Sequence, residues 1–200
     1  LTMQQLLSLR RLVLTVILLA ACGVARADWE LDTTSSTINF VSVKNDSVGE
    51  VHSFASLVGF VGAEGNAQLS VNLESVQTLI EIRDQRMREM LFETAKFPVA
   101  TVTAQLDPSV LAMAAEGGIV TTELPITLSL HGKEKTLTVA LVIVGEGGDR
   151  LAVFSAAPIV INAADFDLAG GVAALQKVAG LQAISTAVPV TLQLQFVKVK

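Results

Sequence analysis

The chain has 200 residues, which suits one domain with a short appendage. Hydrophobic residues make up 51% of it and charged residues 16%, a balance that excludes a disordered chain. A pI of about 5.0 argues against nucleic-acid binding, and the single cysteine excludes an internal disulfide and a four-thiolate metal site. With two histidines and no tyrosine, few side chains suit acid–base chemistry near pH 7, so catalysis is the weaker hypothesis.

Residues 1–27 have the pattern of a secretory signal peptide. The basic pair Arg10-Arg11 precedes an apolar run over residues 12–21, and Ala25-Arg26-Ala27 forms a cleavage site of the A-x-A kind. The run is too short to span a bilayer, which needs about 20 apolar residues. The sequence therefore predicts a periplasmic protein whose folded domain covers residues 28–200.

Cys22 offers an alternative way of processing the chain. The segment Leu19-Ala20-Ala21-Cys22 resembles a bacterial lipobox, whose acylated cysteine would tether the protein to a membrane. A third alternative is a leader that is retained. Cleavage after Ala27 is preferred, because a strand is expected to begin directly at Asp28-Trp29, ahead of the strands given below, which leaves little tether. It removes three arginines and no acidic residue, which takes the formal charge from −5 to −8.

Most of the remaining chain has the two-residue alternation of strands that bury one face. About eight strands are predicted, near residues 35–43, 48–62, 66–74, 99–106, 120–130, 137–143, 150–161 and 188–197. The connections are mostly short turns, such as residues 131–134 and 145–149. The pattern predicts a mainly β fold, either an antiparallel barrel or a sandwich.

Two segments have helical spacing instead. Residues 75–92 carry apolar side chains among arginines and acids, and residues 170–181 carry Val172, Leu175, Val178 and Leu181 on one stripe. Two interpretations are open. Such helices can plug or cover the end of a barrel, or they can simply shield apolar surface.

The residues that could carry chemistry are few. His52 lies in a predicted strand and His131 at a predicted turn, and no acidic residue has ligand spacing to either, so we expect no metal site. No G-x-S-x-G motif is present, and the only thiol lies in the leader, so no nucleophile is predicted. Arg83-Asp84, followed by two more arginines, is either a solvated helix face or an anchor for an anionic head group.

Three motifs together resemble the YceI-like lipid/polyisoprenoid-binding family. The most specific is residues 83–88, Arg-Asp-Gln-Arg-Met-Arg, followed by Phe92 and by Ala-Lys-Phe-Pro-Val-Ala-Thr at 95–101. Residues 126–135 are similar to the family's Leu-Thr-x-x-Gly-x-x-Lys hairpin, and residues 159–166 to its late strand ending in Asp-Phe-Gly. The likeness extends over residues 28–200.

The resemblance implies a lipocalin-like antiparallel barrel whose apolar tunnel holds an isoprenoid chain, in a periplasmic protein. Two departures bear on this expectation. His52-Ser53 stands before Phe54 where the family usually has glycine, and Asp167 replaces the glycine of Asp-Phe-Gly. These departures affect the ligand's identity and length more than the fold.

Alternation and helical spacing together predict which side chains wall the tunnel. Inward positions on the strands and the apolar stripe of the first helix supply ten ligand-binding residues: Phe40, Phe54, Leu57, Met87, Met90, Leu91, Val102, Leu128, Val139 and Phe196. We place Arg83 at the polar mouth, because the start of a helix leaves backbone N–H groups unpaired beside a cation.

Our interpretation is a binding protein that sequesters or carries an isoprenoid such as a polyprenyl chain or a quinone. We expect no catalytic residue and no cofactor; the isoprenoid would be a ligand. One alternative is a non-catalytic envelope stress or interaction protein with a filled barrel, and a less favoured one is an enzyme acting on isoprenoids. The oligomeric state is left open, with a dimer among the alternatives.

The signal peptide leads to a prediction about the mature protein. We expect it in the cell envelope with residues 1–27 removed, as intact-mass analysis of the purified protein will show. A chain beginning at acylated Cys22 would contradict soluble release alone. A full-length chain in the cytoplasm would contradict export altogether.

Overall fold

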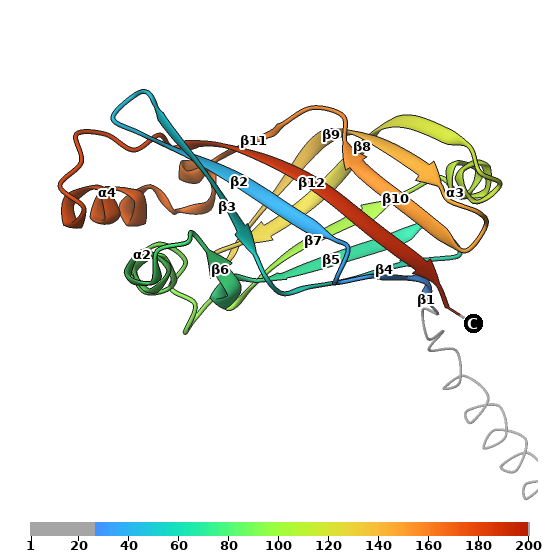
Figure 1. Ribbon diagram of the computed structural model, residues 1–200, viewed down its shortest axis with the longest axis horizontal. Coiled ribbons are helices and arrows are strands. Elements are labelled where there is room, and N and C mark those ends of the chain that lie inside the picture. Colours follow the sequence, from blue (N-terminus) through green and yellow to red (C-terminus); the bar gives the residue numbers. More distant parts are fainter. Residues whose placement is uncertain (1–26, 200) are drawn as a thin grey trace, which may run out of the picture.

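The computed structural model describes residues 27–199, a mainly β domain (Figure 1). The predicted leader and Cys22 lie outside the described residues, apart from the backbone of Ala27. Within these, one antiparallel sheet has twelve strands: β1 (Ala27–Leu31), β2 (Thr37–Lys44), β3 (Val48–Phe54), β4 (Leu57–Gly62), β5 (Asn66–Asn72), β6 (Val76–Gln77), β7 (Val99–Gln105), β8 (Ile119–Leu130), β9 (Lys133–Gly145), β10 (Arg150–Ser155), β11 (Ile159–Asn162) and β12 (Ala187–Lys198).

The sheet closes into a barrel because β1 pairs with β4 on one side and with β12 on the other. The order around the barrel is β1-β4-β5-β7-β8-β9-β10-β12, and all neighbours are antiparallel. Closure leaves these strands without a free edge over their paired lengths. The predicted lipocalin-like barrel of about eight strands is confirmed.

β2 and β3 form a hairpin that extends the sheet beyond the closed part. β12 pairs with β1 through residues 196–198 and with β2 through residues 190–193, so β1 and β2 lie in line along one edge of β12. β3 pairs with β2 and, at its end, with β6. This hairpin lies at the same end of the barrel as the helices α2 and α4, with α3 at the opposite end (Figure 1).

Two predicted strands are each broken in two. The predicted strand 48–62 is interrupted at Ala55 and Ser56, whose N–H groups bond the backbone oxygen and the hydroxyl of Ser75, each at 3.0 Å. The predicted strand 150–161 is interrupted over residues 156–158, where Pro158 has no N–H for a sheet hydrogen bond. Neither break ends the sheet. At the first the partners change from β2 and β6 to β1 and β5, and at the second β12 is kept while β9 is lost.

The helices are short: η1 (Leu73–Ser75), α2 (Glu81–Arg86), the π-helical turn η2 (Met87–Leu91), α3 (Pro108–Ala115), η3 (Ala163–Phe166) and α4 (Ala169–Val178). Within residues 27–199, none has the length and apolar character needed to cross a membrane. The helix predicted over residues 75–92 begins later and changes type, because β6 takes residues 76–77 and Leu79 has a left-handed φ of 63°. The helix predicted over residues 170–181 corresponds to α4.

α3 was not predicted, although its start carries two recognisable signals. The Asp107 side chain accepts a hydrogen bond from the Ser109 N–H at 2.8 Å, and Pro108 occupies the first turn. The helix packs against β8, β9 and β10. Ala114 is fully buried there, so α3 closes the core at its end of the barrel.

This packing predicts the effect of a single added methyl group. A Cβ at Gly145 of β9 would lie 1.6 Å from the backbone oxygen of Ala114 in α3, so Gly145→Ala must displace the helix. We expect a loss of more than about 2 kcal/mol in the free energy of unfolding, measured with urea. The matched control is Gly49→Ala in β3, whose Cβ would meet only Val41 at an ordinary 3.8 Å. Equal stabilities of the two variants would contradict the close approach of α3 to β9.

Candidate ligand-binding cavity

The interior of the barrel contains a cavity of about 290 Å³. Side chains from the barrel strands other than β1, from β2, β3 and β11 and from η1, η2, η3 and α4 line it. Every lining residue except Gln68 is apolar, and Gln68 itself is exposed. Ligand pockets in proteins usually have volumes of about 300–1,000 Å³, so this cavity lies at the lower end of that range.

Small side chains on β5 and β7 help to leave this space. Ala67 and Ala104 face each other across the two strands, and Ala100, four residues before Ala104 on β7, lies on the same inward face. Larger neighbours such as Leu69 and Val102 also line the cavity. A leucine or phenylalanine at an alanine position would occupy part of the volume, so the alanines contribute to the hollow interior.

Seven of the ten predicted wall residues line the cavity: Phe40, Phe54, Leu91, Val102, Leu128, Val139 and Phe196. The other three do not. Leu57 begins β4 directly after the break in the strand and is packed into the core, with 3% of its surface exposed. Met87 is also buried in the core, and Met90 is half-buried.

The π-helical turn explains why Met90 misses the wall. The Phe92 N–H bonds the Met87 oxygen five residues earlier, at 2.9 Å, so the turn contains one residue more than an α-helical turn. Leu91 and Phe92 therefore share the side of Met87, and Met90 does not. Leu91, which was predicted, and Phe92, which was not, line the cavity, while Met87 is buried in the same core cluster as Phe92.

One end of the cavity is closed by η2 and α4. Val172 and Leu168 line it from the α4 side, opposite Leu91, and sequence reasoning did not assign them to the wall. The close approach depends on Gly171, because a Cβ there would lie 2.7 Å from the Met90 oxygen. Of the two interpretations left open for the predicted helices, this arrangement favours a cover over the end of the barrel.

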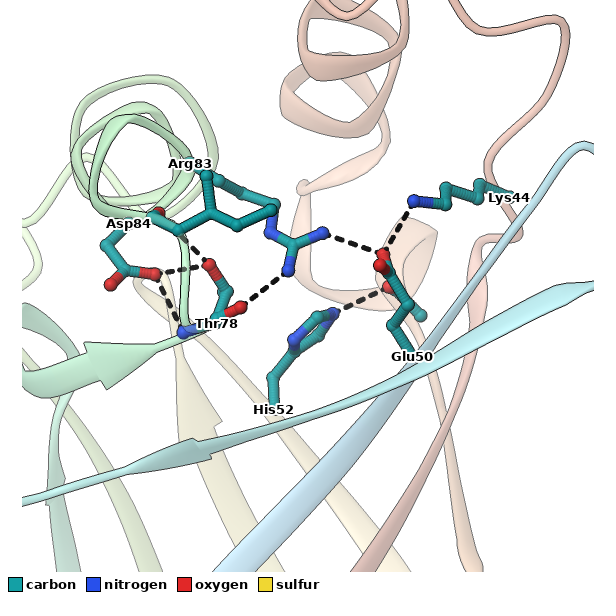
Figure 2. A network of polar contacts seen from close by, with 8 residues as sticks. Lys44, Glu50, His52, Thr78, Arg83 and Asp84 are labelled. Atoms are coloured by element: carbon teal, nitrogen blue, oxygen red, sulfur yellow. Dashed lines mark hydrogen bonds and ion pairs between the residues drawn. The ribbon is translucent and has the colours of Figure 1, made fainter.

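Arg83 and Asp84 lie at this same end and hold the segment before α2 (Figure 2). Asp84 Oδ1 accepts two hydrogen bonds from Thr78, one from the backbone N–H at 2.8 Å and one from the side-chain hydroxyl. Arg83 Nη2 donates to the Thr78 carbonyl at 2.6 Å. The pair thus satisfies both backbone groups of Thr78, which is 2% exposed.

The same arginine reaches across to the β2–β3 hairpin. Arg83 Nη1 and Lys44 Nζ both bond Glu50 Oε2, at 2.7 and 2.9 Å. Hydrogen bonds from Lys44 and Arg83 lower the pKa of Glu50, against the opposing effect of partial burial. Arg83 was placed at the mouth as a cation beside unpaired N–H groups at the start of the helix. The structure pairs its guanidinium with Glu50, its N–H bonds the Ile80 oxygen at 2.9 Å, and its side chain does not line the cavity.

The two histidines lie in separate surroundings. His52 is buried on β3, with Nε2 at 2.7 Å from the Ser42 hydroxyl, whereas His131 Nε2 lies 3.1 Å from Glu93 Oε2 and its Nδ1 lies 3.2 Å from the Phe166 oxygen. Within residues 27–199, no group of three or more His, Cys, Asp or Glu side chains could hold a metal ion.

Asp167 adopts the conformation that glycine favours at the corresponding position of the Asp-Phe-Gly motif. Its φ is 61° and its ψ is 23°, in the left-handed region at the end of η3. Aspartate tolerates this region better than most residues, which makes the departure from glycine compatible with the same turn.

A second cavity of about 300 Å³ adjoins the first between β9 and β11. Val139 and Ile159 line both. It lies where β9 loses β10 as a neighbour, because the β9–β10 register ends at Leu141 and Ser155, and β11 pairs with β12 alone. The barrel wall therefore has no β9–β11 pairing at this gap.

The burial of His52 predicts a pH dependence of stability. Burial lowers its pKa from the ordinary 6.5, and the charge of Arg83 adds to the effect. Because the unfolded chain binds this proton more readily, stability is fully present above pH 6.5 and falls as the pH drops from there towards the folded pKa.

His52→Phe should remove this component. We expect the urea midpoint of the wild type to fall more steeply than that of His52→Phe as the pH is lowered from about 8 to about 5. Parallel curves would show that His52 does not titrate differently in the folded and unfolded states.

Comparisons with known proteins bear on the whole barrel. The model of the YceI-like domain matches residues 29–196. None of the curated proteins matches the chain. Among solved structures, a polyisoprenoid-binding domain from Saccharophagus degradans, implicated in plant cell wall breakdown, is 38% identical, with a TM-score of 0.84 over 87% of this chain and 100% of that one.

Two more distant structures show the fold alone. BcnA of Burkholderia cenocepacia is 16% identical, with a TM-score of 0.64 over 82% of this chain and 98% of that one. The YCEI protein of Campylobacter jejuni is 14% identical, with a TM-score of 0.52 over 80% of this chain and 85% of that one. Since the family model spans nearly all of the described residues and the barrel agrees with it, the chain belongs to the YceI-like domain family.

Proposed function

We propose that this protein binds an isoprenoid, or a lipid with a similar linear tail, inside the barrel and sequesters or carries it. The observation that carries the proposal is the cavity, whose wall is apolar on every side. The polyisoprenoid-binding domain at 38% identity supports the same class of ligand. A linear hydrocarbon needs such a wall because its tail makes no directional hydrogen bonds.

The tail supplies most of the binding free energy in this proposal. Apolar burial contributes roughly 25 cal/mol per Å², or about 0.8 kcal/mol per CH₂ group. Affinity should therefore rise with tail length until the cavity is full. Polyprenyl chains and quinones with a prenyl tail both meet this requirement.

The predicted leader supports a periplasmic location for this activity, with the protein either released after residue 27 or tethered through Cys22. A negative mature charge favours a soluble carrier over adhesion to anionic phospholipid head groups. The carrier would then move a water-insoluble tail through an aqueous compartment.

A non-catalytic role fits the chemistry around the cavity better than an enzyme does. An enzyme acting on isoprenoids would place a histidine and a carboxylate against the tail. His131 does contact Glu93, but neither lines the cavity, and the wall has no acidic residue. A stress or interaction protein with a filled barrel would not need the 290 Å³ of space.

Native mass spectrometry of the protein purified from its own host, followed by lipid extraction, tests the proposal directly. We expect an adduct that is released by organic solvent and identified as a prenyl lipid. Protein of apo mass that also fails to take up farnesol, geranylgeraniol or solanesol, three prenols of increasing length, would contradict the proposal.

A cavity-filling variant provides the sharper measurement. Ala104→Phe adds a ring to the cavity without removing a contact, so it should weaken solanesol binding strongly and farnesol binding least. The matched control is Thr103→Phe, the neighbouring exposed position on β7, which adds the same ring to the outer face. Equal effects of Ala104→Phe on all three prenols would show that the tail lies elsewhere.

A further inference from the structure

The inner face of the β2–β3 hairpin carries an aromatic row that leads out of the cavity. The Phe40 and Phe54 rings, 5.3 Å apart, both line the cavity. The His52 ring lies 5.1 Å from Phe40, its partner across the strands, and two residues from Phe54 on the same face of β3. His52 therefore follows the phenylalanines at the end of the apolar wall.

Beyond His52 the same face becomes polar and then charged. Ser42, two residues after Phe40, bonds His52 Nε2, and its partner across the strands is Glu50. Lys44 and Arg83 meet the Glu50 carboxylate at the outer end of this face. From the cavity outward, the order is apolar, hydrogen-bonding, charged, which is the order of groups along an amphiphile from tail to head.

His52 has an unused hydrogen-bonding atom at the junction. The residue is 3% exposed, and its Nδ1 is buried without a hydrogen-bond partner. The other two buried polar residues in the described part of the chain, Thr78 and Thr94, are bonded to Asp84 and Glu74. An unsatisfied polar atom inside a protein is costly, so its presence calls for a partner such as a ligand or a water molecule.

The two other buried polar atoms without a hydrogen-bond partner also favour a ligand group near His52. Arg83 Nε is also buried without a partner, and it belongs to the network that contacts the hairpin. The third such atom within residues 27–199, Gln195 Oε1, lies between Leu194 and Phe196 of β12, which both face the cavity. Gln195 therefore points to the outer face. The two remaining unpartnered atoms, on His52 and Arg83, lie at the end of the cavity that would hold the tail.

The charges of this network are already balanced. Lys44 and Arg83 both bond Glu50, and Asp84 lies beside Arg83 with its carboxylate on Thr78. Two cations and two carboxylates leave no net positive charge to receive a diphosphate. The side chains of Lys44, Glu50 and Arg83 are only partly exposed, so a diphosphate here would place uncompensated negative charge beside Glu50 and Asp84, which is unfavourable.

We propose that His52 binds the head group of the isoprenoid, and that this head group is an uncharged oxygen, a hydroxyl or a carbonyl, rather than a diphosphate. The inference rests on the proposed function and specifies its ligand class. The Ser42 hydroxyl can donate to or accept from Nε2, so Nδ1 can present a lone pair or a proton. A hydroxyl matches both tautomers, whereas a carbonyl matches only the one with the proton on Nδ1.

Three compounds with the same tail test this assignment by equilibrium dialysis: geranylgeraniol, the corresponding hydrocarbon without the hydroxyl, and geranylgeranyl diphosphate. We expect His52→Phe, which keeps a ring against Phe40, to weaken geranylgeraniol binding about threefold to tenfold and to leave the hydrocarbon within about twofold. The wild type should bind the diphosphate more weakly than the alcohol.

His131→Phe is the matched control, because it makes the same change at a histidine that packs on Phe97 rather than on Phe40 and whose two nitrogens both have partners. We expect it to preserve the wild-type preference for the alcohol. Equal weakening of alcohol and hydrocarbon by His52→Phe would reduce His52 to a packing residue and overturn the proposal. Tighter binding of the diphosphate than of the alcohol would overturn it as well.

A measurement on the wild type covers the case in which His52→Phe does not fold. With ¹⁵N-labelled histidine, the Nδ1 resonance of His52 should shift when geranylgeraniol binds and stay in place when the hydrocarbon binds. An unshifted Nδ1 in the alcohol complex would contradict the hydrogen bond. If the wild type binds none of the three compounds, the proposed function fails, and that outcome is distinct from a failure of the head-group assignment.

Discussion

The pairing of β1 with both β4 and β12 is the constraint on which the rest of this structure depends. Once the sheet is closed, alternate residues of every strand must point into one shared interior. Apolar side chains fill it without the free-energy cost of burying unpaired polar groups. The interior is wider than its side chains require, since alanines face it from β5 and β7. The hollow space is thus a consequence of closure combined with small residues at particular inward positions.

Closure is complete over only part of the molecule, and the polar chemistry lies where it stops. β12 exchanges β1 for β2 along its length, so the β2–β3 hairpin projects past the closed barrel. The inner face of the hairpin continues from the cavity at Phe40 to Glu50, where Arg83 of α2 reaches it. The Arg-Asp pair therefore has a structural role, joining the segment before α2 to the hairpin, in addition to any effect on a ligand.

Several parts of the fold follow directly from residue patterns. The alternation over β8 and β9 predicts both strands and their inward faces, and Val102, Leu128, Val139 and Phe196 line the cavity as alternation requires. Met90 was misplaced, because a single π-helical turn shifts the helical phase and no local signal announces it, and Met87 is buried in the core instead of lining the cavity. α3 was overlooked despite its Asp107 cap and Pro108, since its short apolar stretch has no strong periodicity.

The sequence by itself determined the strands, their inward faces and the family, because period-two alternation and short motifs are properties of neighbouring residues. Only the tertiary structure decided which strands meet, how much space they enclose and which groups share its end. Lys44, Glu50, His52 and Arg83 form one network although they lie up to 39 positions apart in the chain, and Val172 reaches the same cavity from a still later helix. Such contacts depend on long-range pairing and on side-chain volume, which no local pattern records.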